Sequence, residues 1–159
     1  MNFFEQDQRT SISEFQLQQF QDLMVKLYQC CQERIKYQSE RFNLPDAELR
    51  CLLLFGQERY LTSKSIAQKM NVVKSRVTKV INGLVEKNLV QRLQDPEDSR
   101  ITLLSLTAAG QQKLSEINQF LKFVHNEALQ QLEPEQRKTM LTNLDILKAS
   151  LEAVKELMV

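Results

Sequence analysis

Basic and hydroxyl side chains gather between residues 71 and 94, where they suit contact with an anionic polymer. Five cations stand there against the single anion Glu86, a local net charge of +4 in a chain whose total is only +1. The cations are Lys74, Arg76, Lys79, Lys87 and Arg92. Such a patch is typical of a nucleic-acid-binding surface, although an ordinary solvated helix face carries similar charges. The near-neutral total excludes a uniformly basic, histone-like protein.

Residues that usually carry catalysis are scarce. His125 is the only histidine, and its place near the apolar residues Leu121 and Val124 favours packing or an interface over chemistry. The three glycines, Gly56, Gly83 and Gly110, stand apart, which excludes the clustered glycines of a nucleotide-binding loop. Neither a metal-ligating cluster nor a nucleophile paired with a base stands out. We therefore predict a protein that is not an enzyme and needs no cofactor.

The cysteines and the apolar runs indicate the compartment. Cys30, Cys31 and Cys51 are odd in number and lack C-x-x-C spacing, so a disulfide framework or zinc site is not expected. The longest apolar run, Cys51 to Phe55, is far too short to span a bilayer, and residues 1–7 lack the pattern of a secretory signal. These features predict a cytoplasmic protein that does not enter a membrane.

The periodicity of apolar residues predicts a helical chain that is interrupted once, by two short strands. In chain order, we expect helices at Ser13–Asn43, Asp46–Gly56, Lys64–Met70 and Lys74–Lys87, strands at Leu89–Leu93 and Ile101–Leu106, then helices at 107–132 and from Glu133 to the C-terminus. The fold class is mostly α with a small β-hairpin wing. Its order is that of a winged helix-turn-helix with long dimerisation helices at both ends. The predicted domains are residues 1–44, 45–106 and 107–159.

Two long apolar stripes lie in the C-terminal region, and a third runs along the first helix. The stripe of the last helix includes Met140, Leu144, Leu147 and Leu151 at intervals of three and four residues. Such stripes resemble coiled-coil seams and predict a shared homodimer interface. A monomeric bundle that packs the same stripes internally is the alternative.

The helix at 74–87 has one apolar and one polar side. With 100° per residue, the stripe of Val77, Val80, Ile81 and Leu84 places Ser75 and Lys79 directly outward, with Arg76 and Thr78 beside them. In a helix-turn-helix, side chains in these first turns meet base edges. Val73 cannot cap this helix, so the helix is expected to begin late or to rely on water.

Several motifs together resemble the MarR family of bacterial regulators. They are Leu61 to Ala67 (LTSKSIA), Val77 to Lys79 (VTK), Leu84 to Val90 (LVEKNLV), Arg92, the D-x-R of Asp98 and Arg100, and Leu106 to Gly110 (LTAAG). The order and spacing of Arg92, the D-x-R and the L-T-x-x-G are the most specific part. Asn88 replaces the usual glycine, and asparagine tolerates the left-handed conformation required there.

The resemblance implies a sequence-specific regulator that binds double-stranded DNA at an inverted-repeat operator. We expect a repressor released by a small-molecule ligand. The candidate DNA-binding residues are Ser63, Lys64, Lys74, Ser75, Arg76, Thr78, Lys79, Arg92, Asp98 and Arg100. Arg100 at the wing suits a narrow A·T-rich minor groove. The family pattern implies that Asp98 orients an arginine.

The signal that the regulator senses has two interpretations. A small aromatic or anionic effector is one, in a cleft for which Tyr28, Tyr37 and Phe55 are candidate lining residues. Oxidation of Cys30, Cys31 or Cys51 is the other. A winged helix used only for protein–protein contact remains the alternative to DNA binding.

Overall fold

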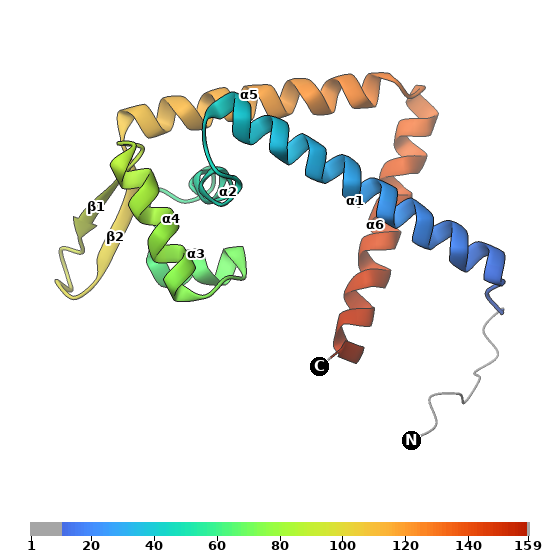
Figure 1. Ribbon diagram of the computed structural model, residues 1–159, viewed down its shortest axis with the longest axis horizontal. Helices are drawn as coiled ribbons and strands as arrows, with labels where there is room; N and C mark the ends of the chain where they lie inside the picture. The colour runs from blue at the N-terminus through green and yellow to red at the C-terminus, as the bar shows by residue number, and fades with distance from the viewer. Residues whose placement is uncertain (1–10, 159) are drawn as a thin grey trace. The chain divides into compact units, whose positions relative to one another are not determined.

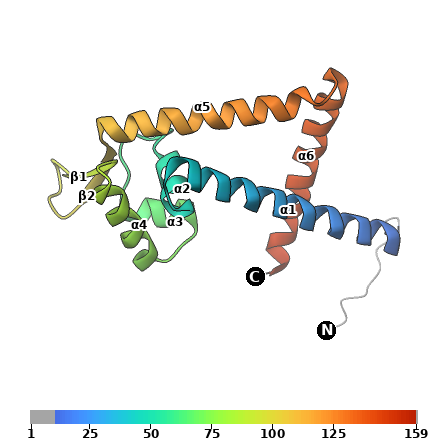
Figure 2. The same ribbon diagram turned by 45° about the horizontal axis from the view of Figure 1, so that its top comes forward.

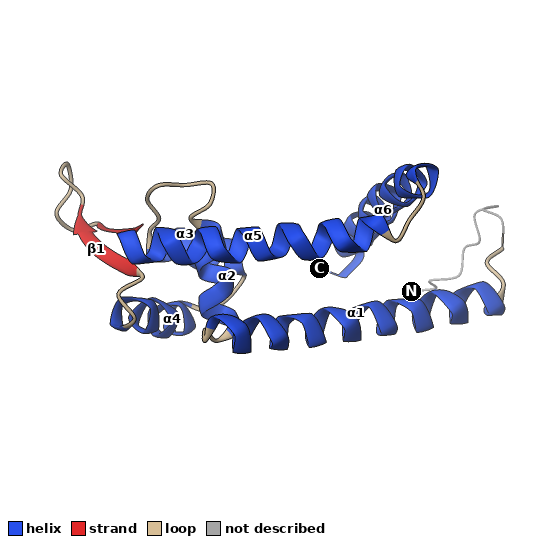
Figure 3. Cartoon of the chain, turned by 90° about the horizontal axis from the view of Figure 1, so that it is seen from above, coloured by secondary structure: helices blue, strands red, loops and turns tan. Residues whose placement is uncertain are grey.

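The computed structural model describes residues 11–158 and is helical except for one β-hairpin (Figures 1 and 3). The elements are α1 (Glu14–Phe42), α2 (Asp46–Leu54), α3 (Ser63–Met70), α4 (Lys74–Glu86), β1 (Val90–Gln94), β2 (Thr102–Leu106), α5 (Ala108–Gln130), α6 (Pro134–Lys155) and a 3₁₀ turn, η1 (Glu156–Met158). The predicted fold class is confirmed. The absence of a signal sequence was predicted from residues 1–7, which lie outside the described residues.

The described residues form two compact units, one ending at Thr107 and the other beginning at Ala108. In the first unit, α2 contacts α1, α3 and α4, while α4 also contacts β1. Figure 2 shows α3 and α4 side by side next to the hairpin. The fully buried side chains Leu52, Ile66, Val77, Leu84 and Leu104 come from all these layers of the lobe. Burial of this apolar surface stabilises the small lobe that α4 depends on for its position.

Three helices end in the same way, with an asparagine in the left-handed region. Asn43, Asn71 and Asn88 have φ angles of 51°, 54° and 58°. In each case the next residue donates its N–H to the carbonyl five residues earlier, as Leu89 does to Leu84 at 2.9 Å. This closes the last helical turn in a Schellman-type arrangement. The expectation that Asn88 takes the left-handed conformation is confirmed.

The hairpin is antiparallel, with Val90 opposite Leu106 and Arg92 opposite Leu104. Both strands begin one residue later than predicted. Leu61 adds an unexpected bridge, because its N–H and carbonyl bond the backbone of Leu104 at 3.0 and 2.7 Å. The segment before α3 therefore fastens the wing to the helices. A strand is recognised in a sequence by a repeat of several residues, and Leu61 is a single residue. The sequence therefore did not indicate this pairing.

The second unit consists of two long helices. Along α5, Gly110, Leu114 and Ile117 are buried, whereas no residue of α6 is buried. Pro134 occupies the first turn of α6, where its missing N–H costs nothing. Within residues 11–158, none of the helices combines the length and apolar character required to cross a membrane.

Candidate nucleic-acid interface

Helix α4 presents one buried and one exposed side. Val77, Val80, Ile81 and Leu84 are buried, between 0 and 6% exposed. Ser75, Arg76 and Lys79 are exposed, as the helical spacing predicts. Because the helix is fixed by its apolar side, these three polar side chains are held on a rigid support. A rigid helix with an exposed basic face is what insertion into a major groove requires.

The start of α4 has no side-chain cap. Val73 is the N-cap residue, and its carbonyl accepts hydrogen bonds from Arg76 at 3.1 Å and Val77 at 3.2 Å. The helix begins at Lys74, as the apolar spacing predicted, and does not begin late as the lack of a capping residue suggested. Val73 is extended, and it contributes only its carbonyl to the first turn of the helix.

Other predicted contact residues lie at helix starts. Ser63 is the first residue of α3, half-buried, and Lys64 follows it exposed to solvent. Lys74 opens α4, and the Thr78 hydroxyl donates to its carbonyl at 3.1 Å. Thr62, not Ser63, caps α3, since its side chain accepts the N–H of Ser65 at 3.1 Å. Ser63 is thereby relieved of a capping role.

The wing carries a bidentate ion pair between two predicted residues. Arg100 Nε donates to Asp98 Oδ1 and a terminal nitrogen donates to Oδ2, both at 3.0 Å. The Arg100 side chain is 88% exposed and that of Asp98 33%. The hydrogen bonds from Arg100 lower the pKa of the Asp98 carboxyl. Asp98 therefore orients the arginine, as the family pattern implied.

Arg92 is joined to the recognition helix. A terminal nitrogen of its guanidinium donates to Asn82 Oδ1 at 2.5 Å, linking β1 to the exposed side of α4. Arg92 was predicted as a phosphate contact. In this structure its guanidinium already has a partner, but it remains exposed. The bond between Arg92 and Asn82 couples the wing strand to α4.

A partly buried ion pair between α4 and α2 was missed by sequence reasoning. Lys87 Nζ lies 2.7 Å from Glu48 Oε2, and the Glu48 side chain is only 10% exposed. Glu48 has a polar neighbour 39 residues away in sequence, and no local spacing signals such a contact.

The three cysteines have different surroundings. Cys51 is buried in α2, and burial, with a smaller contribution from the charge of Glu48, raises the pKa of its thiol to about 12. Cys30 and Cys31 are exposed on α1. Of the aromatic residues considered for an effector cleft, Tyr28 and Tyr37 are exposed, whereas Phe55 is buried in the core.

The order of α2, α3, α4 and the β1–β2 hairpin, with the basic side of α4 exposed, defines a winged helix-turn-helix protein. Residues 44–102 match the family model of the MarR family. This chain is 32% identical over 91 residues to the HTH-type transcriptional repressor MdtR of Bacillus subtilis, covering 57% of this chain and 59% of the relative. The helix-turn-helix region of this chain is therefore similar to the MarR family of transcriptional regulators.

Solved structures share the fold over most of the chain. The YusO protein of Bacillus subtilis is 29% identical with a TM-score of 0.67, covering 89% of this chain and 99% of that one. FabT of Streptococcus pneumoniae, solved in complex with DNA, is 20% identical with a TM-score of 0.75, covering 87% and 99%. The chain spans little more than half the length, 56 to 59%, of several relatives that it matches in sequence.

Proposed function

We propose that this protein binds duplex DNA as a homodimer and regulates transcription from an inverted-repeat operator. The observation that carries the proposal is the exposed face of α4, where Ser75, Arg76 and Lys79 stand opposite a buried apolar stripe. Solved complexes of FabT and of MepR from Staphylococcus aureus with DNA, which have the same fold, support it.

Each predicted residue has a role in this proposal. Ser75, Arg76 and Lys79 meet base edges in the major groove, and Arg is suited to paired acceptors on guanine. Arg100, presented by Asp98, enters the minor groove beside the site. The phosphate contacts are assigned to side chains at the helix starts and on β1, namely Ser63, Lys64, Lys74, Thr78 and Arg92.

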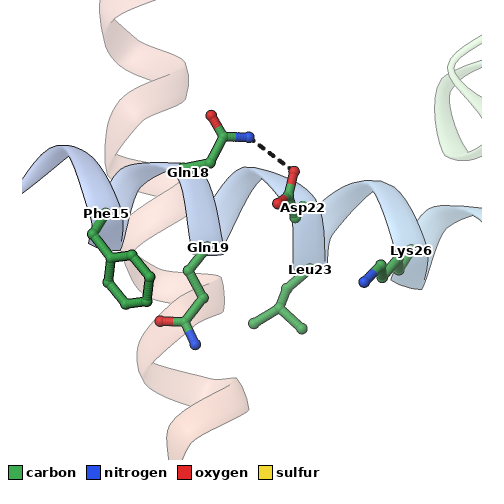
Figure 4. A pocket seen from close by; sticks show the side chains of 6 residues that line it. All are labelled: Phe15, Gln18, Gln19, Asp22, Leu23 and Lys26. Carbon is green, nitrogen blue, oxygen red and sulfur yellow. Dashed lines mark hydrogen bonds between the residues drawn. The ribbon is translucent and has the colours of Figure 1, made fainter.

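The apolar surface of α1 and α6 supports the homodimer. Phe15 and Leu23, which are 76% and 53% exposed, project from one side of α1 together with Gln19 (Figure 4). On α6, Leu144 and Leu151 are 49% and 40% exposed. Exposed apolar side chains repeated along a helix mark a surface that a partner covers. A second copy of this chain would bring two α4 helices into successive major grooves, roughly 34 Å apart.

The DNA-binding test is selection of a site from random duplexes, followed by titration of the selected and a scrambled duplex. We expect tight binding to an inverted repeat and weaker binding of the Lys79→Ala variant. Lys148→Ala, which removes an exposed lysine of α6, is the matched control and should bind as the wild type does. If the wild type binds no duplex and instead captures a protein partner, the protein-interaction alternative replaces this proposal.

The dimer test is sedimentation at micromolar concentration. The wild type should sediment as a dimer. Leu147→Asp with Leu151→Asp should abolish the dimer, because an unpaired charge is costly to bury. A wild-type monomer under these conditions would contradict the homodimer.

For regulation we propose release from DNA by a small aromatic or anionic effector. Cysteine oxidation is the weaker alternative at Cys51, since a thiol with a pKa near 12 yields little thiolate at neutral pH. Cys30 and Cys31 are the accessible positions for it. The test is DNA binding before and after peroxide treatment, for the wild type and for the Cys30→Ser, Cys31→Ser variant. If oxidation of these cysteines is the switch, peroxide weakens DNA binding by the wild type and not by the variant.

A further inference from the structure

The carboxylate of Glu48 lies against the recognition helix although it belongs to α2. Only 10% of its side chain is exposed, and Lys87 Nζ is bound to Oε2 at 2.7 Å. A buried charge is costly unless it is paired, so Glu48 ties the end of α4 to α2. Lys87 is the C-cap residue of α4. The pair therefore acts at the last turn of the recognition helix.

Gly83 explains how the carboxylate comes so close. A Cβ built at Gly83 would overlap Oε1 of Glu48, so any side chain there would displace the carboxylate. Gly83 and Lys87 are one turn apart on the same side of α4. Gly83 and Lys87 together form the site on α4 that the Glu48 carboxylate occupies, which we call the seat.

We propose that Glu48 is a positioning residue for DNA binding: its buried carboxylate, held by Lys87 and admitted by Gly83, sets the direction of α4 without touching DNA. The inference rests on the proposed function. In this proposal Lys87 acts on Glu48 and is not one of the phosphate contacts.

The geometry amplifies a small change at this seat. Arg76 precedes Lys87 by eleven positions in the sequence, which corresponds to roughly 16 Å along a helix axis at 1.5 Å per residue. A tilt of about 5° that pivots at Lys87 would move Arg76 by about 1.4 Å over that length. Hydrogen bonds weaken over a range of about 0.5 Å, so a tilt of this size breaks base contacts.

The test compares Glu48→Gln with Glu58→Gln. Glu58 is the matched control, since it also pairs with a lysine in this lobe, Lys69 at 2.6 Å, and its loss changes the net charge equally. We expect Glu48→Gln to lower operator affinity roughly tenfold, the size of one lost base contact, at unchanged affinity for a scrambled duplex. Glu58→Gln should leave operator affinity unchanged.

A double-mutant cycle with Lys87→Gln separates positioning from direct contact. If the pair positions α4, the double variant binds no more weakly than Glu48→Gln alone, and the salt dependence of affinity matches that of the wild type. An additive cycle with a shallower salt dependence for Lys87→Gln would make Lys87 a phosphate contact and overturn the inference. So would a folded Glu48→Gln variant with wild-type operator affinity.

Two further measurements cover the remaining outcomes. Amide chemical shifts of residues 75–79 in the DNA-free protein should move in Glu48→Gln and stay in place in Glu58→Gln. Gly83→Ala, which displaces the carboxylate and keeps its charge, should reproduce the effect if Glu48→Gln fails to fold. Unmoved shifts in the folded variants contradict the positioning role. If the wild type binds no DNA, the proposed function is contradicted instead. The chemical shifts still test whether Glu48 positions α4.

Discussion

Helix α4 and the tip of the wing are held in contrasting ways, although both are assigned to DNA. Four residues of α4 are buried, and a nearly buried carboxylate and a strand arginine hold it from two sides. The wing tip between β1 and β2 depends on turn hydrogen bonds and on one ion pair, whose arginine is 88% exposed.

The difference indicates where a substitution would change both DNA binding and folding stability. On α4, Arg76, Thr78 and Lys79 each stand next to a core residue in the sequence, so their positions are inherited from the packing of the whole lobe. At the wing, Arg100 is oriented by a residue two positions away in the chain. Under the proposed function, variation at the wing should change DNA binding with little effect on stability, whereas variation beneath α4 should change both.

The largest expected effect comes from the core beneath α4. Leu84→Ala should lower the free energy of unfolding by about 2–5 kcal/mol, because it removes a fully buried side chain and leaves a cavity. Leu93→Ala in the wing, where the side chain is 38% exposed, should cost less than about 1 kcal/mol. Urea unfolding of both variants checks the contrast, and equal losses would contradict it.

Arg76→Ala should act on binding alone. Removal of one base contact is expected to cost roughly 1–3 kcal/mol and to relax discrimination at one symmetric position of the operator. Its helicity and urea midpoint should match those of the wild type, because Arg76 lies outside the buried stripe. Titration of operators altered at single positions measures the change. Uniform weakening at every position would make Arg76 a phosphate contact.

Arg100→Ala should weaken binding to most sequences and reduce preference for A·T-rich flanks. With one phosphate-region charge lost per subunit, the slope of log K against log salt should fall by about 2 per dimer. The melting temperature should match that of the wild type, as for other exposed positions. A salt titration of operator and scrambled duplex decides this, and an unchanged slope would remove Arg100 from the interface.

The smallest expected effect is the acid dependence of the wing. Because Arg100 lowers the pKa of Asp98 below its ordinary value of 3.8, the ionised carboxylate stabilises the folded wing above that pH. This contribution should be lost as the pH falls through the lowered value. The difference in melting temperature between the wild type and Asp98→Asn should thus stay constant from neutral pH to about 4 and shrink below it. A difference that instead disappears well above pH 4 would assign the effect to another group.

Local signals in the sequence predicted most of the elements. Apolar spacing placed α4 and its exposed side, and the change of period on either side of the polar turn at 94–100 placed the hairpin. The family resemblance implied that Asp98 pairs with an arginine, and Arg100, two positions away, is the partner in the structure. Leu61 with Leu104 and Glu48 with Lys87 were not predictable, since each pair forms only after segments far apart in sequence have packed.

The asparagines that end α1, α3 and α4 also affect the unfolded chain. Glycine at these three positions would adopt the left-handed conformation without strain, but it would give the unfolded chain more conformational entropy to lose. Asparagine carries a strain of about 1 kcal/mol in the folded state and restricts the unfolded state by a comparable amount. The two terms nearly cancel. A chain with only three glycines can therefore end its helices sharply at little net cost in stability.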